Sequence, residues 1–178
     1  MYFNNETVLY LDGKFVKASE STTDLYGQTL HYGYGAFEGI RSYETEHGTK
    51  VFKAEEHYER LKKSCELVKI PFDYKVQELV EATYELLEKN NLKNAYIRPL
   101  VYCGQNMSLS KPTRVSVMIA AWDWGAYLGE KLLRLTVSSY CRPHPKSIHI
   151  EAKVCGHYVN SILATNEAKD NGFDEALL

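Results

Sequence analysis

The stretch "HYGYGAFEGIR", residues 31–41, combines three glycines with aromatic side chains and an arginine. Its glycine spacing is G-x-G-x-x-x-G, whereas the dinucleotide-binding fingerprint requires G-x-G-x-x-G between a strand and a helix. Residues 36–45 alternate as a strand does, so Phe37, Gly39 and Arg41 share one face. An aromatic ring, a gap and a cation on one face predict room for an anionic group. A glycine at a bulge beside a solvated arginine is the simpler alternative.

The opposite face of the same predicted strand carries a different set of side chains. It consists of Ala36, Glu38, Ile40 and Ser42. Residues two apart in a strand lie on the same side. The two faces of this strand therefore carry different sets of side chains.

A second predicted strand repeats the pairing of an aromatic ring with a cation. In "AYIRPL", Tyr96 and Arg98 stand at i and i+2, so a phenol and a guanidinium share one face. Arginine is suited to bidentate binding of a carboxylate or a phosphate. Two strands thus offer the same chemistry to one ligand.

Arg60 lies in "EEHYERLKK", one position before the apolar Leu61 on the flank of a predicted helix. Its plain role is that of an exposed partner for Glu56 at i−4, worth only about 0.2 to 0.5 kcal/mol. Its alternative role is that of an anion ligand. The residues alone leave both open.

Lys153 follows the apolar segment "IHIEA" and precedes Gly156 and a predicted helix. A lysine is commonly a solvated surface charge. At the end of a strand and before a turn of small residues, however, its amine would be desolvated. A desolvated amine is free to form a Schiff base.

Composition excludes several classes of protein. The chain has 178 residues, 44% of them hydrophobic, and a net charge of −2, which allows a sizeable core and argues against a basic nucleic-acid binder. No apolar run approaches the roughly 20 residues of a membrane span. The first residues also lack the pattern of a signal peptide. We therefore expect a cytoplasmic protein with neither a membrane nor a nucleic acid as partner.

Neither the cysteines nor the histidines predict a metal site. Four scattered cysteines form no C-x-x-C pair, so they are expected to be reduced and mostly buried thiols. His144 and His149 stand five apart around prolines and without a carboxylate pattern, which is a poor metal signature.

Helical and strand patterns alternate along the chain. Asp12-Gly13 between apolar runs predicts a hairpin, and residues 19–35 read as a loop. Helical spacing covers residues 54–69 and 76–90. The other expected elements are strands at "NAYIRPLVYC", "RVSVMIAAW" and "LRLTVSSY", a helix over residues 158–171 capped by Gly172, and a strand start at "DEALL". The sequence predicts a mixed α/β fold.

Five segments together resemble one family. They are "LHYGYGAFEGIRSY", "EEHYERL", "AYIRPLVY", "AAWDWGAYLGE" and "EAKVCGHYVNSILATNEAKDNGFDEALL", in the order found in class IV pyridoxal-phosphate aminotransferases. The resemblance is strongest to branched-chain amino acid aminotransferases and runs from about Tyr10 to the last residue. It implies a smaller N-terminal α/β domain at residues 1–123, a linker at 124–130 and the first part of a larger cofactor-binding domain at 131–178.

The resemblance also implies an activity. An amino group would pass from leucine, isoleucine or valine to 2-oxoglutarate, giving branched-chain 2-oxo acids and glutamate, with pyridoxal 5'-phosphate as cofactor. The implied partners are small amino acids and 2-oxo acids, and the implied assembly is a homodimer or a higher homo-oligomer.

Residue roles follow from the same resemblance. Lys153 matches the Schiff-base lysine and proton shuttle, Arg60 the ligand of the cofactor phosphate, and Tyr158 the phenol that bonds the ring hydroxyl oxygen. Arg98 matches the residue that accepts the distal carboxylate of glutamate. The positions that wall the substrate pocket are Tyr32, Phe37, Gly39, Arg41, Tyr96, Trp124 and Tyr127. The glycines of residues 31–41 are accordingly expected to make room for substrate.

Two departures from the family pattern and two alternatives accompany this interpretation. His157 stands where many relatives have asparagine, and the chain stops at Leu178, ahead of further cofactor-binding parts of the family, so an incomplete enzyme is expected. The alternatives within the fold are a D-amino acid aminotransferase and an aminodeoxychorismate lyase, against which "FEGIR" and "YIRP" argue. A non-catalytic module that retains the fold is the other alternative, and Lys153 argues against it.

Overall fold

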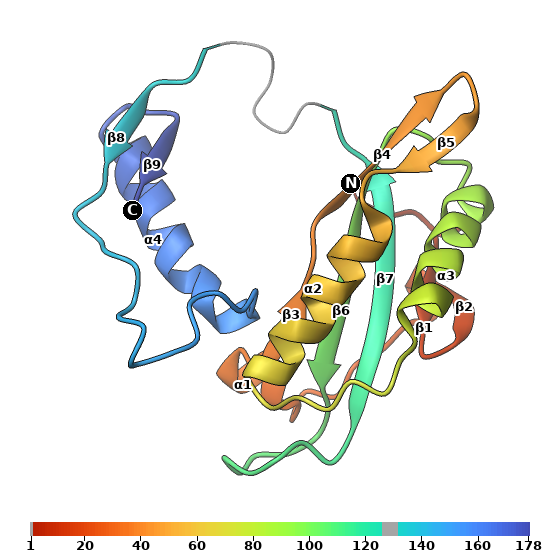
Figure 1. Cartoon of the computed structure of the whole chain (residues 1–178), viewed down its shortest axis with the longest axis horizontal. Helices are drawn as coiled ribbons and strands as arrows, with labels where there is room; N and C mark the ends of the chain where they lie inside the picture. The colour runs from red at the N-terminus through yellow and green to blue at the C-terminus, as the bar shows by residue number, and fades with distance from the viewer. Residues whose placement is uncertain (1, 126–131) are drawn as a thin grey trace.

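A computed structural model describes residues 2–125 and 132–178 (Figure 1). The chain has a mixed α/β fold, as the sequence predicts. Its first part contains β1 (Val8–Leu11), β2 (Lys14–Lys17), η1 (Ala18–Glu20), α1 (Gln28–Tyr32), β3 (Gly35–Phe37), β4 (Ile40–Thr45), β5 (Gly48–Val51), α2 (Ala54–Leu67), α3 (Val76–Lys89), β6 (Ala95–Cys103) and β7 (Val115–Asp123). Its second part contains β8 (Leu135–Val137), η2 (Cys155–His157), α4 (Tyr158–Asp170) and β9 (Glu175–Leu177).

The first part is an antiparallel sheet with two helices on one face (Figure 1). The strands follow the order β2-β1-β7-β6-β4-β5, with β3 also paired to β6. Along β6, every second side chain is buried toward α2 and α3. The intervening side chains, among them Tyr96 and Arg98, lie on the opposite face and are only partly buried. One face therefore builds the core, and the other remains open to ligands.

The core joins the sheet to both helices. Tyr58 and Leu61 of α2 and Leu86 of α3 are fully buried against Ile97 and Val101 of β6. These helix residues recur at the spacing that predicted the helices, because one apolar stripe must face the sheet. Burying such side chains contributes roughly 1.5 to 3 kcal/mol each.

The predicted hairpin and the two long helices are confirmed. Asp12 and Gly13 both have positive φ, 46° and 87°, as a type I′ turn requires, and they join β1 to β2. The helices α2 and α3 end within two residues of the predicted bounds. The prediction of an unbroken loop at residues 19–35 is wrong, because η1 and the short helix α1 form there.

The predicted continuous strand over residues 36–45 is interrupted at Glu38 and Gly39. The register runs through unchanged, since Phe37 pairs with Leu100 and Ile40 with Ile97. The Glu38 N–H donates to the Pro99 carbonyl over 3.0 Å, but proline has no N–H to return the bond. The ladder therefore breaks, while the predicted division of side chains between two faces holds.

The second part is a small parallel pair of strands with one helix. β8 pairs with β9, and α4 ends before Gly172, whose φ of 77° is the left-handed conformation expected after a helix. The predicted strand at "LRLTVSSY" is reduced to the three residues of β8.

The prediction that a strand ends at Lys153 is wrong. Around it, the backbone turns back on itself, with the Ser147 N–H bonded to His144 and the Ala152 N–H to His149. These local bonds use the groups that a strand ladder would need. Val154 forms only an isolated bridge with Ala36 of β3.

Two predictions concern the chain as a whole. Among the described residues, no helix is both long enough and apolar enough to cross a membrane. The domain boundaries, residues 1–123, 124–130 and 131–178, stay a prediction, because residues 126–131 lie outside the described part.

Candidate active site

The backbone of Lys153 is held by two elements of the first part. Its carbonyl accepts a hydrogen bond from the Phe37 N–H over 3.1 Å, and its own N–H donates to the Ser64 hydroxyl of α2 over 3.0 Å. The bridge between Val154 and Ala36 continues this contact by one residue. A lysine that is distant in the sequence is thus fixed against β3.

The amine of Lys153 lies between two aromatic rings. It contacts the Tyr158 hydroxyl and lies 4.5 Å from the ring centroid of Phe37 and 4.6 Å from that of Tyr158. Within the described residues it forms no ion pair with a carboxylate. A partly buried amine beside a phenol, with no acid to neutralise it, is suited to act as a nucleophile or to transfer a proton.

Arg60 pairs with Glu38 and not with Glu56, the partner considered for its plain surface role. Its Nε and Nη2 donate to the two carboxylate oxygens of Glu38 over 2.6 and 2.7 Å, whereas Glu56 lies 3.9 Å from Lys53. Glu38 is fully buried and also contacts Nδ1 of His57 at 2.9 Å. Burial alone would raise the pKa of the Glu38 carboxyl, but the hydrogen bonds and charges of Arg60 and His57 outweigh it and lower that pKa.

The three residues predicted to hold a cofactor line one pocket. Lys153, Arg60 and Tyr158 face an open cavity of about 380 Å³ at the junction of α2, η2 and α4. The cavity combines a cation, an amine and a phenol. This donor set fits a small molecule with a phosphate at one end and an aldehyde at the other.

The same pocket contains two side chains whose part was not expected. Arg142 lines it and donates from Nη1 to the Asn160 side chain over 3.0 Å. His157 lines it as well, with its Nδ1 3.2 Å from the Ala152 carbonyl. Burial lowers the pKa of His157, which favours the neutral ring.

The sheet face beside this pocket brings the two predicted arginines close to aromatic rings. Arg98 donates from Nη2 to the Tyr96 hydroxyl over 2.8 Å and lies over the Phe37 ring at 4.6 Å. Its Nε is buried and has no hydrogen-bond partner in the described part of the chain. Arg41, opposite Tyr96 on β4, instead donates to the carbonyls of Trp124 and Gly125. Arg98 therefore has one buried donor without a partner, while Arg41 is hydrogen-bonded to the two residues that follow β7.

The glycines of residues 31–41 allow close approach of other protein atoms, and their expected role of making room for substrate stays a prediction. A Cβ at Gly39 would lie 2.2 Å from the Tyr96 hydroxyl oxygen, and one at Gly35 would lie 2.8 Å from Thr29. A Cβ at Gly33 would lie 2.5 Å from Cα of Gly156. The gap beside Arg41 is thus filled by a phenol.

Replacing Gly39 with alanine is expected to displace Tyr96 and break its bond to Arg98. Overpacking of this kind costs about 1 to 3 kcal/mol of stability, which urea unfolding would measure. Gly104→Ala is the matched control, because its added Cβ would meet other atoms only at 3.5 Å and beyond. Equal stability of the two variants would contradict the close contact.

Of the remaining residues predicted to wall the substrate pocket, one lies beside Tyr96, one lies apart from it and one is outside the described residues. Trp124 contacts Tyr96 edge to face with centroids 5.0 Å apart, and Trp122, which sequence reasoning missed, lies 5.1 Å from the same ring. Tyr32 donates to the Met107 carbonyl, and no described ring contact or hydrogen bond joins it to Phe37 or Tyr96. Tyr127 lies outside the described residues.

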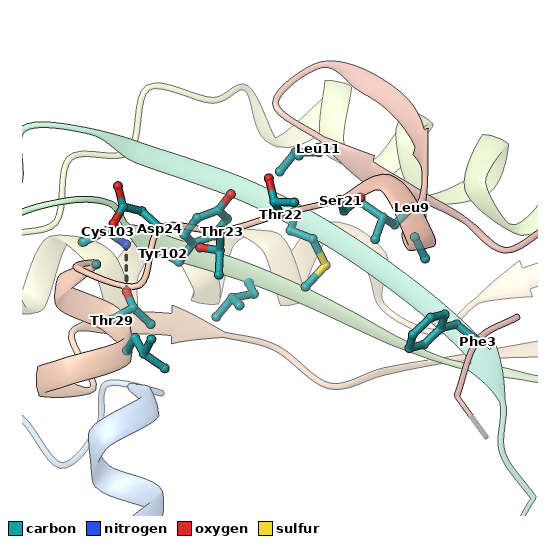
Figure 2. Close-up of a pocket in the computed structure, with 15 residues that line it drawn as sticks. Phe3, Leu9, Leu11, Ser21, Thr22, Thr23, Asp24, Thr29, Tyr102 and Cys103 are labelled. Atoms are coloured by element: carbon teal, nitrogen blue, oxygen red, sulfur yellow. Dashed lines mark hydrogen bonds between the residues drawn. The ribbon is translucent and has the colours of Figure 1, made fainter. Parts of the chain in front are cut away.

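A larger hollow elsewhere on the sheet holds none of these residues. It has a volume of about 520 Å³ and lies between β1, the 21–24 loop, α1 and the ends of β6 and β7 (Figure 2). Its lining is mostly apolar, and the Thr29 hydroxyl on its wall accepts the N–H of Cys103 (Figure 2). Within the described ranges, neither an arginine nor a lysine lines it. Chemistry rather than size therefore marks the smaller pocket as the candidate site.

Metal or thiol chemistry finds no support in the described residues. There, no group of three histidine, cysteine, aspartate or glutamate side chains could hold a metal ion. Cys65 and Cys103 are buried thiols, Cys155 is partly buried, and Cys141 is exposed. Burial raises the pKa of Cys65 to about 12 and that of Cys103 to about 11, which keeps both protonated.

Comparison with known proteins gives a consistent result. Residues 35–178 match the family described as amino-transferase class IV. A branched-chain-amino-acid aminotransferase of Pseudomonas aeruginosa is 40% identical over 98% of this chain and 59% of its own length. That of Escherichia coli K12 is 38% identical over 95% of this chain and 57% of its own.

Solved structures agree. The branched-chain amino acid aminotransferase of E. coli superposes with a TM-score of 0.92 at 36% identity, covering 96% of this chain and 59% of that one. The branched-chain aminotransferase of the thermophilic archaeon Thermoproteus uzoniensis, solved with norvaline, superposes with a TM-score of 0.90 at 36% identity, covering 97% and 59%. The chain thus spans less than three fifths of the length of these relatives.

Proposed function

Because the chain belongs to the amino-transferase class IV family, we propose that it serves pyridoxal-phosphate-dependent transamination of leucine, isoleucine or valine with 2-oxoglutarate. The observation that carries the proposal is the Lys153 amine, held against the Tyr158 hydroxyl in the pocket that Arg60 lines. The names of the relatives support the substrate class. A relative solved with pyridoxamine 5'-phosphate supports the cofactor.

The proposed chemistry divides between cofactor and protein. When bound, pyridoxal phosphate supplies the electron sink for loss of a proton from the substrate Cα. Lys153 would attach to the cofactor and move that proton as base and then acid. Arg60 would hold the phosphate through its uncommitted N–H groups, and Tyr158 would bond the ring hydroxyl oxygen.

One pocket would serve two kinds of amino acid. The rings of Phe37 and Tyr96 offer an aliphatic side chain a surface on which to pack, and Arg98 beside them would bind the distal carboxylate of glutamate. Relatives solved with norvaline and with N-(5'-phosphopyridoxyl)-L-glutamate carry both kinds of ligand. Arg41, Gly39 and the tryptophan at 124 would support this wall, and Tyr127 and Tyr32 stay proposed wall residues.

The proposal is tested by supplying leucine, 2-oxoglutarate and pyridoxal phosphate and measuring the glutamate formed. Activity only with D-amino acids would favour the D-amino acid aminotransferase alternative. No conversion and no visible absorbance change with the cofactor would favour the non-catalytic module. A homo-oligomer in the cytoplasm is part of the proposal, and light scattering on the purified protein would test its assembly.

Arg60→Ala is expected to weaken binding of pyridoxal phosphate about 10- to 150-fold, because a charge-assisted hydrogen bond contributes roughly 1.5 to 3 kcal/mol. Titration of the cofactor, followed by absorbance, would give the dissociation constant. Arg114→Ala is the control, since it removes an equally charged side chain that is 75% exposed and pairs with Asp12. Unchanged affinity in Arg60→Ala would return this residue to a structural role.

A further inference from the structure

From the buried carboxylate beneath Arg60, we infer that Glu38 is a positioning residue for the cofactor phosphate. It holds the Arg60 guanidinium so that one edge of that group is fixed and the other edge points to the ligand. The inference rests on the proposed function, in which Arg60 binds the phosphate. Glu38 itself would touch neither substrate nor cofactor.

The hydrogen bonds of Arg60 divide its guanidinium into two edges. Nε and Nη2 form a fork onto the two oxygens of Glu38, at 2.6 and 2.7 Å. A guanidinium has five N–H donors in a rigid plane, so this fork uses one edge and leaves the Nη1 side free. In the described part of the chain, Nη1 donates no hydrogen bond. The free edge is the one that a phosphate could take bidentately.

The carboxylate that holds Arg60 is itself immobilised. The Gly39 N–H donates to its Oε2 over 3.2 Å, and His57 Nδ1 contacts the same oxygen at 2.9 Å. Because an ionised carboxylate only accepts hydrogen bonds, His57 must carry its proton on Nδ1. The backbone of Glu38 is tied to Pro99 of β6 at the interrupted ladder. The carboxylate is therefore held from two sides, by the Gly39 N–H next to the sheet and by His57 of α2, the helix that also carries Arg60.

The arrangement matters because Arg60 alone would not be ordered. Its side chain is 54% exposed at the surface of α2, where a long arginine samples many rotamers. An ordered arginine loses less rotamer freedom when the phosphate binds, which favours binding. Glu38 would also repel the phosphate, but four donors share its charge: Nε and Nη2 of Arg60, Nδ1 of His57 and the Gly39 N–H. Ordering is therefore expected to dominate.

The test compares two cofactor forms, pyridoxal phosphate and pyridoxal, which lacks the phosphate. In the full chain, Glu38→Gln is expected to lower the affinity for pyridoxal phosphate about 10- to 100-fold, as loss of an outer partner does for metal ligands. The affinity for pyridoxal should be nearly unchanged. Glu38→Gln keeps the side-chain shape, and Glu38→Ala is the more severe variant. Glu78→Gln, an exposed carboxylate paired with Lys75, is the matched control.

A double-mutant cycle separates positioning from general destabilisation. In an Arg60→Ala background, Glu38→Gln should change the affinity for pyridoxal phosphate no further. Equal weakening of both cofactor forms, additive effects in the double variant or tighter phosphate binding would each overturn the inference. If the wild-type protein itself did not prefer pyridoxal phosphate to pyridoxal, the proposed role of Arg60 would fail first. A preference that Glu38→Gln retains would overturn the inference alone.

Discussion

Lys153→Ala is expected to abolish the visible absorbance change that pyridoxal phosphate gives with the wild-type protein. It should also lower transamination by at least about 10²- to 10⁴-fold, the usual contribution of a positioned acid–base group. The reason is geometric, because the amine lies between Phe37 and Tyr158 and contacts the phenol. Among the residues that the structure describes, no other lysine lines this pocket.

Lys146→Ala is the matched control, since Lys146 is an exposed lysine of the same segment. Borohydride reduction of the protein with its cofactor, followed by peptide mapping, would locate the covalent label. The label is expected on Lys153. A label on another lysine would show that the reactive amine is assigned to the wrong residue.

Arg98→Ala is expected to lower the rate of the half-reaction with glutamate and 2-oxoglutarate much more than that of the half-reaction with leucine. Glutamate and 2-oxoglutarate bring a second carboxylate, and leaving it unpaired in a buried site costs about 2 to 5 kcal/mol. This corresponds to tens- to thousands-fold in kcat/KM. Leucine lacks that group and would meet a slightly more apolar wall, so its rate should change much less. Single-turnover rates with each amino acid separately would measure both effects.

Two outcomes distinguish Arg98 from its neighbour. Arg114→Ala, outside the pocket, should leave both amino acids unaffected. If leucine and glutamate lost rate equally in Arg98→Ala, then Arg98 would support the α-carboxylate or the fold. Arg41 would then become the better candidate for the distal carboxylate, although its Nη1 is hydrogen-bonded to the Trp124 and Gly125 carbonyls.

Local sequence patterns correctly predicted the long helices, the long strands and the hairpin. α2 and α3, the long strands β6 and β7 and the hairpin at Asp12-Gly13 follow from apolar spacing and turn chemistry. The break between β3 and β4 did not, because its cause, the missing N–H of Pro99, lies on another strand. The segment before Lys153 is apolar enough for a strand, but in the described part of the chain its local turns replace a ladder, and the nearest bridge is that of Val154 with Ala36.

The candidate site was predictable in its residues and less so in its contacts. The sequence resemblance selected Lys153, Arg60 and Tyr158, and these residues do line one pocket. It did not select Glu38, although one signal was available: the alternation of residues 36–45 puts this acid on the core face beside Ile40. A buried carboxylate needs a cationic partner. That requirement favours buried Glu38 over Glu56 as the carboxylate that pairs with Arg60.

The backbone contact between β3 and the lysine segment has a consequence for biosynthesis. Every strand of the larger sheet lies before residue 124, so a ribosome releases the sheet roughly 30 residues ahead of Lys153. At about 5 to 20 residues per second, that interval is roughly 2 to 6 s. Pairing Val154 with Ala36 closes a long loop, whose entropic cost grows only with the logarithm of its length. A nascent chain thus completes its larger sheet before Lys153 is made, and under the proposed function attachment of a cofactor must follow the contact between Val154 and Ala36.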